Sequence, residues 1–182
     1  AVIAHGAAAL PEGGRLAVTY LRPLDLSVDE MLAEIQSAVE RVGATRVVID
    51  SLSGFEVALA PTYRADFRKS LYRLVGALTA TGVTVLMTDE VVDANPGSRF
   101  THERVSFITD DILVQRYVEI DGCLQKVLSV VKMRGSDHAT DFRAYQLTSD
   151  GAVMGGSLAN YRGITTGVPE LADLVVAVAP NA

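Results

Sequence analysis

The first half of the chain alternates between apolar segments with helical period and apolar segments without it. From residue 28 to residue 42, apolar side chains recur every three or four positions, which predicts an amphipathic helix. Ser27 and Glu30 have the spacing of a capping box at its start, and Gly43 is placed to end it. Residues 46–50 instead contain the continuous β-branched run Val47-Val48-Ile49, so they predict a strand covered on both faces.

A second helix and strand follow in the same order. Pro61 predicts the start of a helix that runs to about residue 80. Its apolar face carries Phe67, Leu71, Leu74, Val75 and Leu78. Residues 83–88 predict a second buried strand, and residues 16–20 a short strand near the beginning of the chain. Alternating strands and helices favour an α/β fold with a mainly parallel sheet and crossover helices.

After residue 110 the pattern changes to antiparallel strands. Two long runs are separated by Asp121-Gly122, a dipeptide favoured in two-residue hairpin turns. The predicted hairpin strands are residues 111–120 and 123–133, and shorter strands are predicted at 142–147 and 152–154.

The composition of the chain disfavours some classes of function. The 182 residues fit one domain, and a net charge of −6 disfavours binding to nucleic acid, which needs clustered Lys and Arg. Cys123 is the single cysteine, so no internal disulfide forms, which suits a cytoplasmic protein. No apolar run is long enough to span a bilayer. The sequence leaves the order of the apolar tail, residues 171–182, open.

Two short segments carry candidate chemistry. The strand ending in Asp50 has the Walker B pattern, in which the carboxylate holds Mg²⁺ through water beside nucleotide phosphates. Taken alone, a capping role for this aspartate is the favoured interpretation. The segment Lys132-Met133-Arg134-Gly135-Ser136, followed by His138, combines two cations with a glycine that lets the backbone approach phosphate. On spacing alone, a solvated strand end explains this segment equally well.

Together with residues 115–119 and 160–169, these segments resemble KaiC-family ATPases in order and spacing, over nearly all of residues 15–170. The similarity is greatest to the second, carboxy-terminal domain. It implies a RecA-like P-loop core with an added antiparallel hairpin. Residues 1–182 then form one partial ATPase domain that is truncated on its amino-terminal side.

The resemblance also implies a composite site. Such domains form rings, usually hexamers, with ATP and Mg²⁺ bound between subunits. Asp50 then belongs to one subunit, and the neighbour contributes Lys132, Met133, Arg134, Gly135, Ser136 and His138. Lys132 and Arg134 would act in trans like an arginine finger. Ser106 is a candidate site of autophosphorylation, although an unmodified loop serine is the simpler interpretation; Phe107 lacks the hydroxyl of a second site.

The chain departs from this family at one decisive place. It contains no Gly-x-x-x-x-Gly-Lys-Ser/Thr motif, and the family's paired catalytic glutamates would precede Ala1. We therefore expect the intact protein to be longer and this chain alone to be inactive. The missing Walker A strand would belong between residues 83–88 and 111–120, so its absence leaves two unpaired strand edges.

The sequence alone leaves two functions open. One is an ATP-hydrolysing signalling or clock-like ATPase that also has the potential for autokinase activity. The other is a non-catalytic oligomerisation or interaction module that keeps the fold without ATP turnover. A RecA-type protein that handles DNA is disfavoured by the acidic charge.

Overall fold

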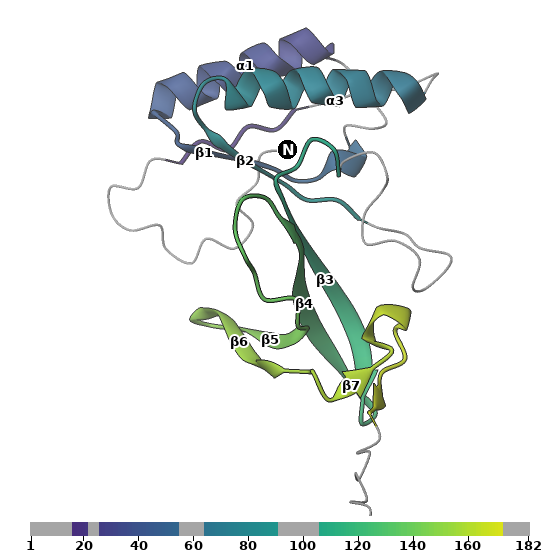
Figure 1. The fold of residues 1–182 in the computed structure, drawn as a ribbon. Helices are drawn as coiled ribbons and strands as arrows, with labels where there is room; N and C mark the ends of the chain where they lie inside the picture. Colours follow the sequence, from purple (N-terminus) through teal and green to yellow (C-terminus); the bar gives the residue numbers. More distant parts are fainter. Residues whose placement is uncertain (1–15, 22–25, 55–63, 91–105, 173–182) are drawn as a thin grey trace, which may run out of the picture. The chain divides into compact units, whose positions relative to one another are not determined.

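The computed structural model describes residues 16–21, 26–54, 64–90 and 106–172. The chain divides into two compact units, residues 1–91 and residues 92–182, and each is described by itself (Figure 1). In the described residues, no helix is both long enough and apolar enough to cross a membrane.

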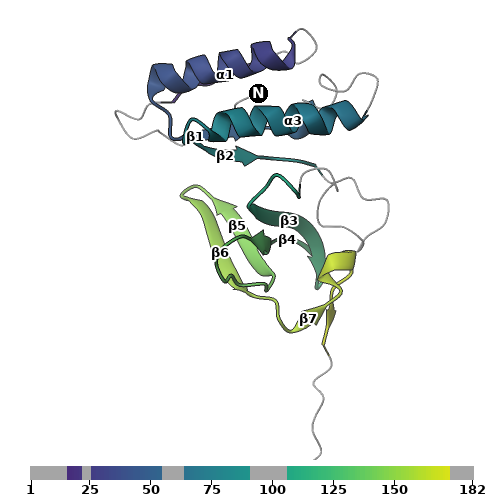
Figure 2. The same cartoon turned by 45° about the horizontal axis from the view of Figure 1, so that its top comes forward.

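Among the described residues of the first unit, two long helices pack on a pair of parallel strands. The elements are α1 (Val28–Val42), β1 (Arg46–Ile49), α3 (Arg64–Thr79) and β2 (Thr84–Met87). The helices lie side by side over the strands in both cartoon views (Figures 1 and 2). The pairing of β1 with β2 is parallel, which confirms the predicted strand and helix alternation. The predicted strand at 16–20 is wrong, because only Thr19 forms a β-bridge there.

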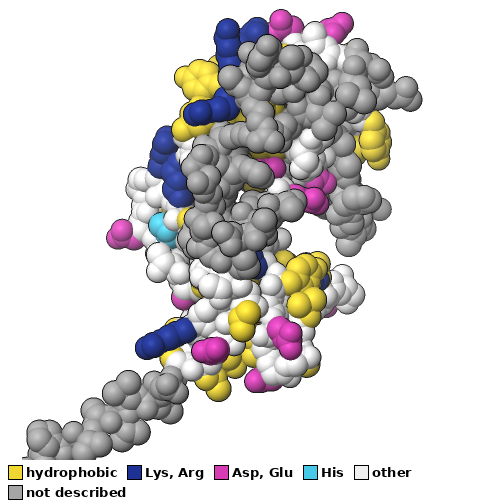
Figure 3. Space-filling model, turned by 90° about the vertical axis from the view of Figure 1, so that its right-hand side faces the viewer, with side chains coloured by type: hydrophobic (Ala, Val, Ile, Leu, Met, Phe, Trp, Pro, Cys, Tyr) yellow, Lys and Arg dark blue, Asp and Glu magenta, His cyan; other side chains and the backbone are white. Residues whose placement is uncertain are grey.

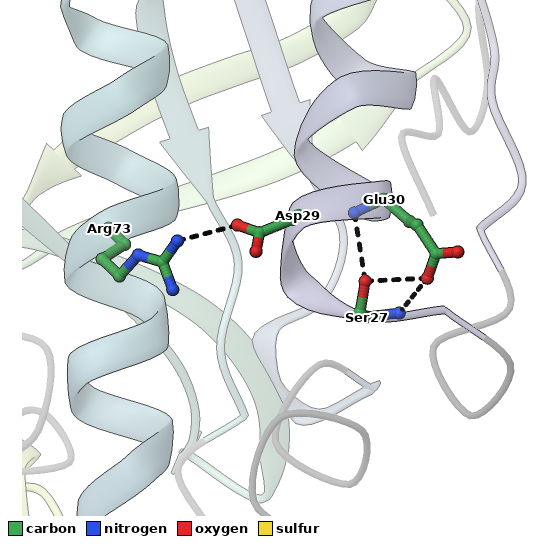
Figure 4. Close-up of polar contacts among 4 residues, drawn as sticks. All are labelled: Ser27, Asp29, Glu30 and Arg73. Carbon is green, nitrogen blue, oxygen red and sulfur yellow. Dashed lines mark hydrogen bonds and ion pairs between the residues drawn. The ribbon is translucent and has the colours of Figure 1, made fainter.

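The capping box at the start of α1 forms as predicted (Figure 4). The backbone amide of Glu30 donates to Ser27 Oγ over 3.3 Å, and the Ser27 amide donates to Glu30 Oε2 over 2.7 Å. The Ser27 amide and the Ser27 hydroxyl both donate to Glu30 Oε2, and they lower the pKa of the Glu30 carboxyl because its ionised form accepts these two bonds. Gly43 adopts a left-handed conformation at φ 61° and ends the helix. Arg73 of α3 forms an exposed ion pair with Asp29 of α1 at 2.8 Å.

The core of this unit lies between the helices and one face of the strands. All five apolar residues predicted for the second helix are buried: Phe67, Leu71, Leu74, Val75 and Leu78. Met31 and Ile35 of α1 and Val47 and Ile49 of β1 join them.

The strand predicted at residues 83–88 is confirmed for Thr84–Met87, but the prediction that it is buried is wrong. Positions along β2 alternate between half-buried and exposed, and Leu86 is 56% exposed. The reason is structural: β2 has β1 as its sole sheet neighbour among the described residues, and α1 and α3 lie on one face. Val85 and Met87 share register with the buried Val47 and Ile49, so Leu86 belongs to the opposite face.

The second unit is an antiparallel sheet of four strands in the order β3-β4-β5-β6. These strands are Asp111–Ile120, Cys123–Met133, Arg143–Thr148 and Gly151–Ser157, in agreement with the predicted hairpin and short strands. Asp121 at φ 53° and Gly122 at φ 72° form the turn between the first two. Positive φ at both central positions is the geometry that hairpin twist favours.

A short segment that the sequence analysis missed packs on the β3–β4 hairpin near its turn. It comprises β7 (Tyr161–Arg162), the 3₁₀ helix η1 (Ile164–Thr166) and β8 (Glu170–Leu171). Ile164 is buried against Val118, Ile120 and Val127 of the hairpin. Arg116, on the same face of β3 as Val118 and Ile120, also holds the segment, because its Nη1 donates to the carbonyl of Thr165 over 2.7 Å.

Candidate functional site

Asp50 lies directly after β1, at the carboxyl end of the parallel strand pair. Its Oδ1 accepts a hydrogen bond of 2.5 Å from Thr88 Oγ1, at the corresponding end of β2. Two backbone bonds fix Thr88 in place: its amide donates to Ile49 O, and its carbonyl accepts from the amide of Leu52. The peptide bond between Asp50 and Ser51 is cis. The carboxylate is therefore held between two strand ends.

This arrangement suits a carboxylate that organises a divalent cation. In open α/β sheets, ligands bind outside the carboxyl ends of parallel strands, where Asp50 and Thr88 meet. Mg²⁺ typically takes one or two carboxylates and completes its octahedral shell with water and phosphate oxygens. The described residues contain no group of three or more acidic, His or Cys side chains placed to hold a metal.

The end of β4 carries the second candidate segment, and Lys132 there has an unexpected position. Its ammonium donates to the backbone carbonyls of Ser106 and Thr109, over 2.7 Å to the first. Both bonds are partly buried, so the cation is directed at a turn of its own chain. Met133 follows as the last residue of β4, half-buried and paired with Asp111 of β3.

Arg134, by contrast, is exposed. Its guanidinium forms an ion pair of 3.3 Å with Asp110, and the two side chains are 57% and 78% exposed. An exposed pair of this kind contributes little stability and exchanges readily for another anion. Gly135 follows at φ 78°, a conformation that other L-residues rarely adopt, and Ser136 is exposed.

His138 presents the clearest unsatisfied polar atom. Its Nε2 is buried and has no hydrogen-bond partner among the described residues. Buried polar atoms in native proteins nearly always have partners, so an unpaired one needs an explanation. A ligand or another subunit would have to reach this buried atom to supply the partner.

The predicted site residues thus fall into two groups. Asp50 belongs to the first unit, and residues 132–138 belong to the second. Within the second unit, Lys132 and Ser106 are in direct contact. Thr88 and Asp110 were not predicted as site residues, although the position of Thr88 at a strand end was the signal that could have revealed it. His5 and His102 lie outside the described residues.

One face of the molecule carries side chains of several kinds (Figure 3). In the view shown there, basic, acidic and apolar side chains of the described residues are all present. The net charge of the whole chain is −6.

Comparison with known proteins identifies relatives of the chain. The chain is 31% identical over 160 residues to the circadian clock oscillator protein KaiC of Thermostichus vulcanus, covering 88% of this chain and 30% of that protein. It is 33% identical over 155 residues to the circadian clock oscillator protein KaiC 1 of a Synechocystis strain, covering 85% and 29%. The chain therefore spans about 30% of the length of these relatives.

A solved structure shows a similar fold. The crystal structure of a KaiC-like protein from Pyrococcus horikoshii OT3 superposes with a TM-score of 0.61 at 26% identity, covering 71% of this chain and 54% of that one. The predicted fold class, an α/β RecA-like core with an added antiparallel hairpin, is confirmed. A family model described as "ATPase: KaiC" matches residues 18–158, a range that includes Asp50 and the whole of the 132–138 segment. The chain belongs to the KaiC family of ATPases.

Proposed function

We propose that this chain forms part of an ATP-binding ATPase in which ATP and Mg²⁺ lie between subunits of a ring. The observation that carries the proposal is the position of Asp50, which the Thr88 hydroxyl holds at the carboxyl ends of the parallel strands β1 and β2 in a chain of an ATPase family. The descriptions of the relatives as circadian clock proteins make signalling or clock-like regulation the most direct role. We further propose that residues 1–182 act as one partial domain, in a cytoplasmic protein.

Each group of residues would have a distinct task. Asp50, oriented by Thr88, would hold Mg²⁺ through water and position the phosphates. The segment Lys132–Ser136 and His138 would approach from the neighbouring subunit. A guanidinium at that position stabilises charge on the transferring phosphoryl group and offers a planar fork to its oxygens. Bound Mg²⁺ would supply charge neutralisation at the phosphates.

Hydrolysis is the reaction that we favour, with autophosphorylation of Ser106 as a further possibility to test. Ser106 is half-buried, and its carbonyl oxygen accepts a hydrogen bond from the Lys132 ammonium. Mass spectrometry of the full-length protein after incubation with ATP would detect phosphate on this residue. A hexameric ring is the assembly that the family resemblance implies, and mass photometry with and without ATP would measure it.

A non-catalytic interaction module is the second candidate. It is favoured by one observation: Lys132, predicted to contact phosphate, donates instead to the carbonyls of Ser106 and Thr109 in its own chain. Under this alternative, the fold and its surfaces are kept for assembly, and ATP is not turned over.

Calorimetry separates the two candidates. Mg²⁺-ATP would be titrated into the full-length protein that contains this chain, as wild type and as Asp50→Asn and Arg134→Met variants. We expect wild-type binding and turnover, and losses of about tenfold or more in affinity or rate for each variant, because each removes a charge from the phosphate site. Asp121→Asn is the matched control, since Asp121 lies in an exposed hairpin turn where Asn also tolerates positive φ. No binding by the wild type would favour the interaction module.

A further inference from the structure

Asp110 and Arg134 lie next to each other just beyond the paired part of the β3–β4 hairpin. The last residues in register there are Asp111 of β3 and Met133 of β4. One position further on, the amide of Arg134 donates to the carbonyl of Asp110 over 3.2 Å, and Arg134 Nη1 donates to Asp110 Oδ1 over 3.3 Å. The two residues are therefore joined twice, once through the backbone and once through their side chains.

The two bonds differ in how easily they are replaced. The backbone bond continues the hydrogen bonding of the hairpin by one step, and it does not depend on the side chain at residue 110. The ion pair is exposed, with side chains that are 57% and 78% accessible to solvent, so water and salt screen it. A guanidinium binds carboxylate and phosphate oxygens with the same planar fork of N–H donors. The Asp110 carboxylate thus occupies a donor that a phosphate would use.

Asp110 also changes the charge that an arriving anion meets. A guanidinium alone presents a full positive charge, whereas a guanidinium beside a carboxylate is nearly neutral at a distance. A second carboxylate, Asp111, follows as the first residue of β3, but Asp110 is the one that forms the ion pair with Arg134. An anion has to displace one carboxylate before Arg134 can bind it fully. This requirement favours a triphosphate, with several charged oxygens, over a singly charged small molecule.

We propose that Asp110 is a competitor, within the chain, for the guanidinium of Arg134. In the empty site its carboxylate holds Arg134 against its own hairpin, and a nucleotide phosphate replaces it when the site is filled. Asp110 therefore lowers the affinity for nucleotide and sets which anions Arg134 binds. The nucleotide part of this proposal rests on the proposed function above, whereas the pairing of Asp110 with Arg134 in the empty protein does not.

Two matched variants separate this role from a general effect of charge. Asp110→Asn removes the charge, keeps the size of the side chain and leaves the backbone bond in place. Asp111→Asn removes the same charge one residue along the chain, from an exposed side chain at the start of β3. Both are made in the full-length protein that contains this chain, and Mg²⁺-ATP is titrated into each by calorimetry. Circular dichroism spectra that match the wild type show that the variants are folded.

Asp110→Asn should bind Mg²⁺-ATP about threefold to tenfold more tightly than the wild type, because no ion pair has to be broken and the negative charge beside the phosphate is gone. Asp111→Asn should stay within about twofold of the wild type. In an Arg134→Met background, Asp110→Asn should lose most of its gain, since the two side chains no longer interact. A gain of the same size in that background, equal gains for both aspartates, or no gain for Asp110→Asn would each overturn the proposal.

Modification of arginine tests the pairing without nucleotide. Phenylglyoxal forms adducts with guanidinium groups, and mass spectrometry follows the adduct on the peptide that contains Arg134. Asp110→Asn should speed this reaction about threefold or more, because the guanidinium is released. The adduct on Arg143, which pairs with Asp141 at 3.2 Å, should form at the wild-type rate. An unchanged rate at Arg134 would overturn the pairing part. A wild type that binds no Mg²⁺-ATP while this rate rises would refute the proposed function and the competitor role, and would leave the ion pair alone confirmed.

Discussion

The hydrogen bond between Thr88 and Asp50 should set how well the strand ends hold Mg²⁺. Thr88 Oγ1 lies 2.5 Å from Asp50 Oδ1, and the backbone of Thr88 is fixed to Ile49 and Leu52 on either side. Thr88→Val removes the hydroxyl and keeps the β-branched shape. Thr88→Ser keeps the hydroxyl and removes a methyl group. The pair separates the effect of the hydrogen bond from that of side-chain volume.

The magnitude follows from the charge and exposure of the pair. A hydrogen bond to an ionised group contributes about 1.5–3 kcal/mol when it is protected from water. Thr88 is exposed and Asp50 is half-buried, so solvent reduces this to about 0.5–1.5 kcal/mol. Without the bond, the carboxylate must be ordered when Mg²⁺ arrives. We therefore expect Mg²⁺-ATP to bind about threefold to tenfold more weakly in Thr88→Val.

Calorimetry with the full-length protein measures this directly, with ATP titrated in the presence of Mg²⁺ and again in the presence of a chelator. Thr88→Val should lose affinity with Mg²⁺ and little without it, and Thr88→Ser should behave as the wild type. Equal losses in both conditions would show that Thr88 acts on the nucleotide site through the fold and not through the cation. An affinity that matches the wild type in Mg²⁺ would refute the role given to the bond.

Three further predictions concern stability. Ser27→Ala should lower the free energy of unfolding by about 1 kcal/mol, because the first turn of α1 loses its cap. Ser37→Ala, on the exposed side of the same helix, should raise it by a few tenths of a kcal/mol. Urea denaturation followed by circular dichroism compares the two variants. The pKa of Glu30 is lowered from its ordinary value of 4.5, so its contribution is complete above that value and is lost as the pH falls through the lowered pKa, which the same denaturation at pH 3–6 would show as a slope that Glu30→Gln removes. Gly163→Ala should destabilise the chain by at least about 2 kcal/mol more than Gly167→Ala: both have positive φ, but an added Cβ meets a backbone oxygen at 2.5 Å in the first and nothing within 4 Å in the second. Equal losses at the two glycines would count against this account.

Much of the fold was predictable because its signals are local. The capping box of α1 depends on two residues three apart, and the Asp121-Gly122 turn depends on two neighbours. The buried face of α3 follows directly from helical period. By contrast, β7 and β8 have two residues each, too few for an alternating pattern to be recognised. Their arrangement depends on Ile164 reaching a core formed about forty residues earlier in the chain.

The sequence predicted which residues form the candidate site, but it did not predict which residues their side chains contact. The end of an apolar strand identified Asp50, and the mixture of cations with glycine identified residues 132–138. Spacing carries no information about where a long side chain points, so the contact of Lys132 with Ser106 and Thr109 was not foreseen. Nor does it reveal that the carboxylate partner of Thr88 lies 38 residues away. Such pairs depend on how strands are placed next to each other.

The edge of β2 links the fold to the site. Among the described residues, β2 and β3 each end a sheet, so each presents one edge without a strand partner, and Leu86 is 56% exposed on the face opposite the helices. An exposed apolar residue beside an open strand edge marks a surface that suits a further strand. Because β1 and β2 are parallel, a parallel strand added to β2 would end level with Asp50 and Thr88. The loop after it would then lie where a phosphate-binding backbone is needed beside the Mg²⁺ carboxylate. Completion of the sheet and completion of the nucleotide site would thus be achieved by the same element, and a protein that supplies this strand should gain stability and ATP binding together.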